Sequence, residues 1–172
     1  MKKSKLCPHL YYSSIYTIDL DKIKSLKIKG LIIDLDNTIL PHHHFIVSEE
    51  LKSWFKNLIE RGFKVCVISN NSAYKVKKIA DKLQVPFIFN AVKPLPWSFR
   101  KATKILSLEK KYIAIVGDQM FTDILGGNWF GIFTILVKPM NPYEHWWTRK
   151  LRILQKKLLN KFISNGELKY LY

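Results

Sequence analysis

The sequence has 172 residues, of which 48% are hydrophobic and 24% are charged, and its formal net charge is +16. Such a composition supports a globular protein with a hydrophobic core, and it excludes disordered, collagen-like and disulfide-scaffold classes. Residues 1–29 carry a net charge of +5 and residues 138–172 carry +6, so the two ends of the chain are strongly basic. Because Lys far outnumbers Arg, compositional bias is an alternative explanation for part of this charge.

We expect a single domain over residues 1–172, with a basic N-terminal extension (1–29), a core (30–137) and a basic C-terminal tail (138–172). The longest apolar stretch, near residues 129–137, is about half of the ~20 residues that cross a bilayer. The N-terminus lacks the apolar segment of a secretory signal. Cys66 lies in an apolar run and is predicted to be a buried free thiol. These features favour a cytoplasmic protein, or an organellar one if the source is eukaryotic.

Short apolar runs alternate with segments of helical period, which predicts an α/β fold with a mainly parallel, five-stranded sheet. The helix that starts near Ser48 places Leu51, Trp54 and Leu58 on one face. Pro86 favours an edge position for the third strand. The five predicted strands cover residues 30–35, 63–68, 85–89, 112–116 and 133–137.

Polar residues follow four of these strands. Asp34 and Asp36 end the first strand, and two carboxylates there are costly unless a cation compensates their charge. Ser69-Asn70-Asn71 follows the second strand, Lys93 the third, and Asp118 with Asp123 the fourth. Because the carboxyl ends of parallel strands meet at one edge, we expect these groups to face a common ligand.

Phosphoryl transfer is the chemistry that suits this set of groups. A carboxylate can attack phosphorus and form an acyl phosphate. The nucleophile and the phosphate are both anionic, so a bound Mg²⁺ and a nearby Lys are needed to offset their repulsion.

Four segments at the strand ends resemble, in order and in position, the four motifs of the haloacid dehalogenase-like (HAD) phosphatases. They are Asp34-Leu35-Asp36-Asn37-Thr38, Ser69-Asn70, Lys93, and Gly117-Asp118 with Asp123. The sequence is similar over residues 10–140 to the subclass IIIA, YqeG-type branch, related to mitochondrial phosphatidylglycerophosphate phosphatase. The resemblance implies a Rossmann-like, three-layer α/β/α fold and hydrolysis of a phosphomonoester through an aspartyl-phosphate.

The resemblance also implies roles for the metal-binding residues. Asp34 is the expected nucleophile and a Mg²⁺ ligand. Asp36 is the expected general acid and then base, and its backbone carbonyl also binds the metal. Asp118 completes the ligands that the protein supplies, and Asp123 supports the metal directly or through water.

The expected phosphate-binding residues come from three of the motifs. Ser69 is expected to donate a hydrogen bond to a phosphoryl oxygen, and Lys93 to neutralise the nucleophile and the phosphate, so both are counted as catalytic. The predicted substrate-binding residues are Thr38, Ser69, Asn70 and Lys93.

No cap domain is expected, because residues 39–63 and 71–92 have room only for a loop, a helix and a short strand. An open site suits a phosphate presented by a large body, such as a lipid headgroup, a protein or a nucleic acid. His42-His43-His44 is interpreted as a solvated loop beside the site, with a dedicated metal site as the alternative.

A basic amphipathic helix is predicted from Trp146 to Phe162, with Trp147, Leu151, Leu154, Leu158 and Phe162 on one face. This face can lie in an anionic membrane interface or pack on the sheet, and the two are compatible.

The sequence thus predicts a Mg²⁺-dependent phosphatase, and the resemblance implies phosphatidylglycerophosphate, an anionic lipid, as substrate with peripheral membrane contact. One alternative is a phosphatase for a soluble or macromolecular phosphomonoester. The other is a nucleic-acid or ribosome-associated binding protein on a HAD scaffold, and it is disfavoured because four carboxylates at one edge repel nucleic acid.

Overall fold

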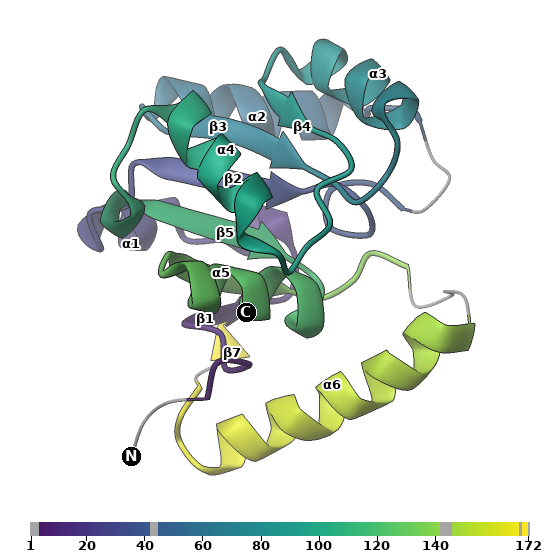
Figure 1. Ribbon diagram of the computed structural model, residues 1–172. Coiled ribbons are helices and arrows are strands. Elements are labelled where there is room, and N and C mark those ends of the chain that lie inside the picture. The colour runs from purple at the N-terminus through teal and green to yellow at the C-terminus, as the bar shows by residue number, and fades with distance from the viewer. Residues whose placement is uncertain (1–3, 42–44, 142–145, 169, 172) are drawn as a thin grey trace.

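The computed structural model describes residues 4–41, 45–141, 146–168 and 170–171 (Figure 1). Its centre is a seven-stranded sheet in the order β4-β3-β2-β5-β6-β1-β7, and every neighbouring pair is parallel. The strands are β1 (Leu10–Tyr12), β2 (Gly30–Asp34), β3 (Lys64–Ile68), β4 (Phe87–Ile88), β5 (Ile113–Gly117), β6 (Phe133–Val137) and β7 (Tyr170–Leu171).

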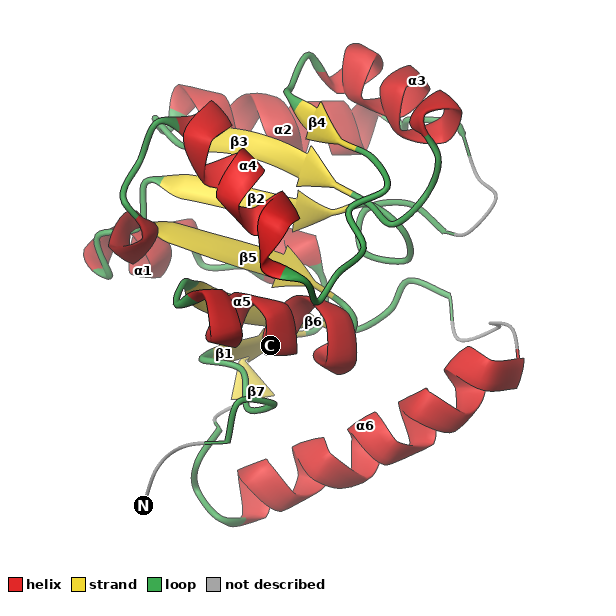
Figure 2. Ribbon diagram, in the orientation of Figure 1, coloured by secondary structure: helices red, strands yellow, loops and turns green. Residues whose placement is uncertain are grey.

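Helices cover both faces of the sheet, as Figure 2 shows. One hydrophobic cluster joins α1, α2 and α3 to one face, and a second joins α4 and α5 to the other. The predicted three-layer α/β/α fold is therefore confirmed. The helices are α1 (Leu20–Ser25), α2 (Glu49–Glu60), α3 (Ala73–Leu83), α4 (Pro96–Leu106), α5 (Leu125–Phe130) and α6 (Trp146–Ser164), with single helical turns at Ile15–Thr17, Lys110–Tyr112 and Met120–Ile124.

The five predicted strands correspond to β2 through β6, and β4 lies at the edge of the sheet, as Pro86 indicated. The predicted number of strands is wrong, because β1 and β7 extend the sheet beyond β6. Both are only two or three residues long, so they show no periodicity in the sequence. Their strand geometry depends on hydrogen bonding to neighbours that are distant along the chain.

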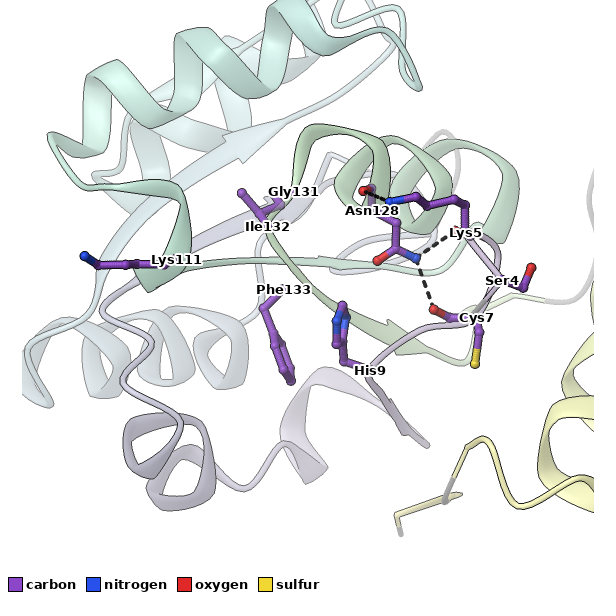
Figure 3. A pocket seen from close by; sticks show the side chains of 9 residues that line it. All are labelled: Ser4, Lys5, Cys7, His9, Lys111, Asn128, Gly131, Ile132 and Phe133. Carbon is purple, nitrogen blue, oxygen red and sulfur yellow. Dashed lines mark hydrogen bonds between the residues drawn. The ribbon is translucent and has the colours of Figure 1, made fainter. Parts of the chain in front are cut away.

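Hydrogen bonds hold the N-terminal residues 5–9 against the sheet and α5, and Figure 3 shows those made by Asn128 to Lys5 and Cys7. The Asn128 Nδ2 atom donates to the carbonyl oxygens of Lys5 at 2.7 Å and Cys7 at 3.0 Å. The Asn128 Oδ1 atom accepts from the Thr134 hydroxyl at 3.2 Å. The His9 backbone N–H donates to the Thr134 carbonyl at 3.0 Å. Asn128 therefore connects three separate segments of chain.

Both cysteines are free and buried, so the prediction for Cys66 is confirmed. Burial raises the pKa of the Cys66 thiol to about 12, which keeps it protonated and unreactive near neutral pH.

The inner face of α6 is different from the predicted one. Leu159 and Phe162 are buried against residues of the Met120–Ile124 turn and β6, so the packing alternative is confirmed for this half of the helix. Leu151 and Leu154, predicted on the same face, are 47% and 46% exposed. The buried side of α6 instead includes Gln155 and the partly buried Arg152. Because both residues are polar, the sequence pattern on this side is that of a solvent-exposed face.

The side chain of Trp147, also predicted on that face, lies outside the described residues, as does the His42–His44 loop. Within the described ranges, no helix combines the length and the apolarity needed to cross a bilayer.

We predict that Asn128→Ala lowers the free energy of unfolding by roughly 1 kcal/mol, because the carbonyl oxygens of Lys5 and Cys7 lose the donor that holds the N-terminal segment on α5. The measurement is urea denaturation followed by circular dichroism. Asn165→Ala is the matched control, since the Asn165 amide contacts the neighbouring Glu167 side chain at the surface. Equal stabilities of the two variants would contradict the role given to Asn128.

Candidate active site

Three buried carboxylates meet at the carboxyl edge of the sheet. Asp34 is the last residue of β2, Asp118 directly follows β5, and Asp123 lies in the helical turn after β5. Because β2 pairs with β5, the ends of these strands are adjacent. Asp34 is 4% exposed and the other two are 0% exposed, and oxygen atoms from all three lie within 4.8 Å of one another. The expected cluster is therefore present in the fold.

The close approach of Asp123 depends on Gly117, the last residue of β5. A Cβ atom at this position would collide with the Asp123 side chain. The Asp123 Oδ2 atom accepts a hydrogen bond from the Gln119 backbone N–H at 3.1 Å, which fixes the carboxylate inside its own turn.

Lys93 is buried between two of these carboxylates. Its Nζ donates to Asp34 Oδ1 and, at 2.6 Å, to Asp123 Oδ1. Burial by itself lowers the pKa of Lys93, but the carboxylates of Asp123 and Asp34 outweigh burial and raise the pKa above its ordinary value. Lys93 is therefore a permanent cation at the centre of the cluster.

The backbone turns sharply after β2, and this turn places the Thr38 hydroxyl beside two of the carboxylates. Asn37 has φ of 63°, a left-handed conformation that Asn tolerates better than most residues. The Thr38 hydroxyl contacts Asp34 Oδ2 at 2.9 Å and Asp118 Oδ1 at 3.2 Å. Thr38 thus bridges two carboxylates, and its predicted contact with substrate stays a prediction.

Asp36 lies beside the cluster and is held from β3. The Ser69 hydroxyl donates to Asp36 Oδ2 at 2.7 Å, and Asn71 Nδ2 donates to the same oxygen at 2.6 Å. In this structure, Ser69, predicted to bind a phosphoryl oxygen, orients Asp36. Asn71 was not singled out as a site residue, although its place next to Ser69-Asn70 was the available signal.

A cavity of about 170 Å³ opens above these groups. Asn70 lines it, and its Oδ1 accepts from the Lys93 backbone N–H at 2.9 Å, so Asn70 also supports the Lys93 loop. Gln119 and Thr122 are unanticipated lining residues. The full lining is Asp34, Asp36, Asn70, Asn71, Lys93, Gln119 and Thr122.

Sequence reasoning also missed Arg152, which reaches the cluster from α6. Its guanidinium forms an ion pair with Asp118 Oδ2. The signal was weak, because an Arg in a helix rich in Lys is usually solvated.

The charges of the cluster suit a divalent cation. Among the described residues, three buried carboxylates form ion pairs with two cations, Lys93 and Arg152. Burial raises the pKa of Asp34 well above its ordinary value. The Lys93 ammonium lowers this pKa in part, and the carboxylates of Asp123 and Asp118 raise it further. Closely spaced carboxylate oxygens are the ligands that Mg²⁺ prefers, so the residues present fit this ion.

Comparison with known proteins identifies the family. A family model described as mitochondrial PGP phosphatase matches residues 1–140. The chain is 34% identical over 170 residues to the probable phosphatase YqeG of Bacillus subtilis, and the match covers 99% of both chains. The chain belongs to the PGP phosphatase family.

Further relatives carry related names. This phosphatase is 25% identical over 173 residues to phosphatidylglycerophosphate phosphatase 1, chloroplastic/mitochondrial, of Arabidopsis thaliana, covering 92% of its own length and 49% of the plant protein. It therefore spans about half of that relative. An uncharacterized protein from Listeria monocytogenes serotype 4b has the same fold, with a TM-score of 0.51 and 18% identity over 77% of this chain and 97% of that chain.

These matches confirm the resemblance to the YqeG-type branch of the HAD superfamily. The PGP phosphatase family member described here is accordingly a phosphoric monoester hydrolase.

We predict that Thr38→Val lowers kcat by about fivefold, because Asp34 and Asp118 lose the one hydroxyl proton that they share, a contact worth about 1 kcal/mol. Phosphate release from p-nitrophenyl phosphate measures this effect. Thr103→Val is the matched control, since the Thr103 hydroxyl only bonds back to its own helix at the Phe99 carbonyl. Unchanged turnover in Thr38→Val would show that the bridge has no role in catalysis.

Proposed function

We propose that this phosphatase hydrolyses phosphatidylglycerophosphate in a Mg²⁺-dependent reaction through an aspartyl-phosphate on Asp34. The observation that carries the proposal is the cluster of Asp34, Asp118 and Asp123 around Lys93, beneath a small polar cavity.

The chemical steps follow from the positions of two carboxylates. The Asp34 carboxylate lines the cavity and attacks phosphorus, and the bond from phosphorus to the leaving alkoxide breaks. Asp36, on the same cavity, gives its proton to that alkoxide. Asp36 then takes a proton from water, whose oxygen attacks phosphorus, so that inorganic phosphate leaves and Asp34 is regenerated.

The other residues orient these groups and offset charge. Lys93 neutralises Asp34 and the incoming phosphoryl group. Ser69 and Asn71 hold Asp36 at 2.7 and 2.6 Å, which keeps its carboxyl turned to the cavity. Asn70, exposed at the cavity, is positioned to bind a phosphoryl oxygen. Thr38 holds Asp34 and Asp118 together, and its contact with substrate stays a prediction.

Asp34, Asp118 and Asp123 are the side chains that would hold Mg²⁺, with the Asp36 backbone carbonyl as the further predicted ligand. When bound, the ion supplies positive charge to the nucleophile and the phosphoryl oxygens.

The lipid substrate is supported by family membership and by the open architecture. Between β2 and β3 the described residues hold α2, and between β3 and β5 they hold α3, β4 and α4, so no inserted domain covers the cavity there. The phosphate of a lipid headgroup can therefore reach Asp34 while its chains stay in a bilayer.

We predict a higher kcat/KM for phosphatidylglycerophosphate in mixed vesicles than for any member of a panel of soluble phosphomonoesters. Phosphate release measures both. Asp34→Asn, the inactive control, is expected to lose about 10⁴-fold or more in kcat on every substrate, because the nucleophile is removed. Equal or better turnover of a soluble ester would overturn the lipid substrate, and turnover by Asp34→Asn would overturn the aspartyl-phosphate.

The outer face of α6 supports contact with an anionic membrane. Lys150, Ile153, Leu154, Lys157 and Lys161 are all exposed, and we call these five residues the α6 outer face. Ile153 is 56% exposed and Leu154 is 46% exposed. Apolar side chains between cations suit the interface of an anionic bilayer, where each Lys contributes about 1 kcal/mol.

We predict that replacing Lys150, Lys157 and Lys161 by Gln weakens binding to phosphatidylglycerol vesicles about 100-fold, since about 3 kcal/mol of attraction is lost. Flotation at low ionic strength measures binding. The control replaces three exposed Lys on α3 and α4, which are Lys77, Lys82 and Lys104. An equal loss in both triple variants would show that only total charge matters, and the α6 outer face would then have no special role.

A further inference from the structure

Helix α6 contacts the carboxylate cluster from outside the segment that the family model matches. Arg152 donates through Nη2 to Asp118 Oδ2 and through Nη1 to the Asp118 carbonyl oxygen. Gln155 Nε2 donates to the same carbonyl oxygen at 2.9 Å, and Gln155 Oε1 accepts from the Met120 N–H at 2.9 Å. Two side chains of one helix thus hold the backbone on both sides of Gln119.

We propose that Arg152 and Gln155 are positioning residues of the metal site, and that α6 acts as a structural part of the catalytic centre. The inference rests on the proposed function in one respect, which is that Asp118 binds the metal ion.

The two carboxylate oxygens of Asp118 have different partners. Oδ1 accepts from the Thr38 hydroxyl at 3.2 Å, and that hydroxyl also contacts Asp34 Oδ2, so Oδ1 faces the cluster. Oδ2 faces α6 and pairs with Arg152. The planar guanidinium binds this oxygen and the carbonyl of the same residue together, which fixes the rotation of the side chain. Arg152 therefore leaves Oδ1 directed at the cluster.

Burial makes these contacts hard to replace with water. Asp118 is 0% exposed and Gln155 is 6% exposed, while the side chain of Arg152 is 16% exposed. Removing one partner of a buried ion pair takes away its counter-charge and its hydrogen bonds, and the Asp118 side chain would then be able to rotate. Leu159 and Phe162 of α6 pack against an apolar surface that includes Met120, Ile124 and Leu136.

Loss of Arg152 has two effects on metal affinity, and they have opposite signs. Removing a cation next to the cluster strengthens the attraction for a divalent ion, whereas freeing Asp118 weakens binding. Gln155 carries no charge, so its replacement reports the positioning effect alone. Loss of a residue that orients a ligand typically costs about 10–100-fold in metal affinity.

The test measures Mn²⁺ binding to the full chain by electron paramagnetic resonance, without substrate. Gln155→Met and Arg152→Ala are each expected to weaken Mn²⁺ binding about tenfold or more, and Arg152→Lys to recover part of the loss. Lys156→Ala is the matched control, because it removes one exposed charge from the same helix. Its Mn²⁺ affinity should stay within about twofold of the unmodified protein.

A second measurement separates positioning from general damage. The Mg²⁺ concentration for half-maximal phosphate release should rise in Gln155→Met and Arg152→Lys, while KM at saturating Mg²⁺ stays near that of the unmodified protein and circular dichroism shows both variants folded at the assay temperature. If Arg152→Ala does not fold, these two variants decide the question.

Tighter Mn²⁺ binding by Arg152→Ala with unchanged binding by Gln155→Met would overturn the proposal and leave Arg152 as a counter-charge only. Equal Mn²⁺ affinities in all variants would overturn it as well, while the proposed metal site would stand. Absence of Mn²⁺ binding by the unmodified protein, with Asp118→Asn as reference, would overturn the metal site itself and the positioning role with it.

Discussion

The carboxylates of Asp34, Asp118 and Asp123 repel one another in a region that water barely reaches. Such a cluster is unfavourable unless cations and hydrogen-bond donors surround it. Lys93 lies between two of the carboxylates, and Arg152 pairs with the third. The closely spaced oxygen atoms of the carboxylates suit a divalent ion. Much of the local structure therefore stabilises three neighbouring carboxylates, which the proposed reaction brings close to an anionic phosphate.

The parallel sheet solves this problem by bringing distant segments to one edge. Asp34 and Asp118 end paired strands, so their separation of 84 positions in the sequence becomes a contact in space. The turn at Asn37 adds the Thr38 hydroxyl, and the loop after β4 adds Lys93. Because each group is attached to a packed strand or a tight turn, little entropy is left to lose when substrate binds.

Helix α6 joins two surfaces with different chemistry. Its inner side places Arg152 and Gln155 against the Asp118 loop, and its outer face exposes Lys and apolar side chains. A bilayer that binds the outer face and a carboxylate that binds the metal would then be connected by one rigid element. Under the proposed function, the basic charge at the C-terminal end of the sequence has two separate uses, one at the Asp118 loop and one at a membrane surface.

The layered α/β fold, β2 through β6 and the groups at the strand ends could be predicted from the sequence. Burial on a sheet leaves a periodic apolar pattern, and polar residues after a strand lie at the carboxyl edge. Three features emerged only in the folded chain: β1 and β7 extend the sheet, Asn71 holds Asp36, and Arg152 and Gln155 turn inward. These features depend on partners far away along the chain. A short strand or a polar side chain on a basic helix acquires its role only from the neighbour that folding brings to it.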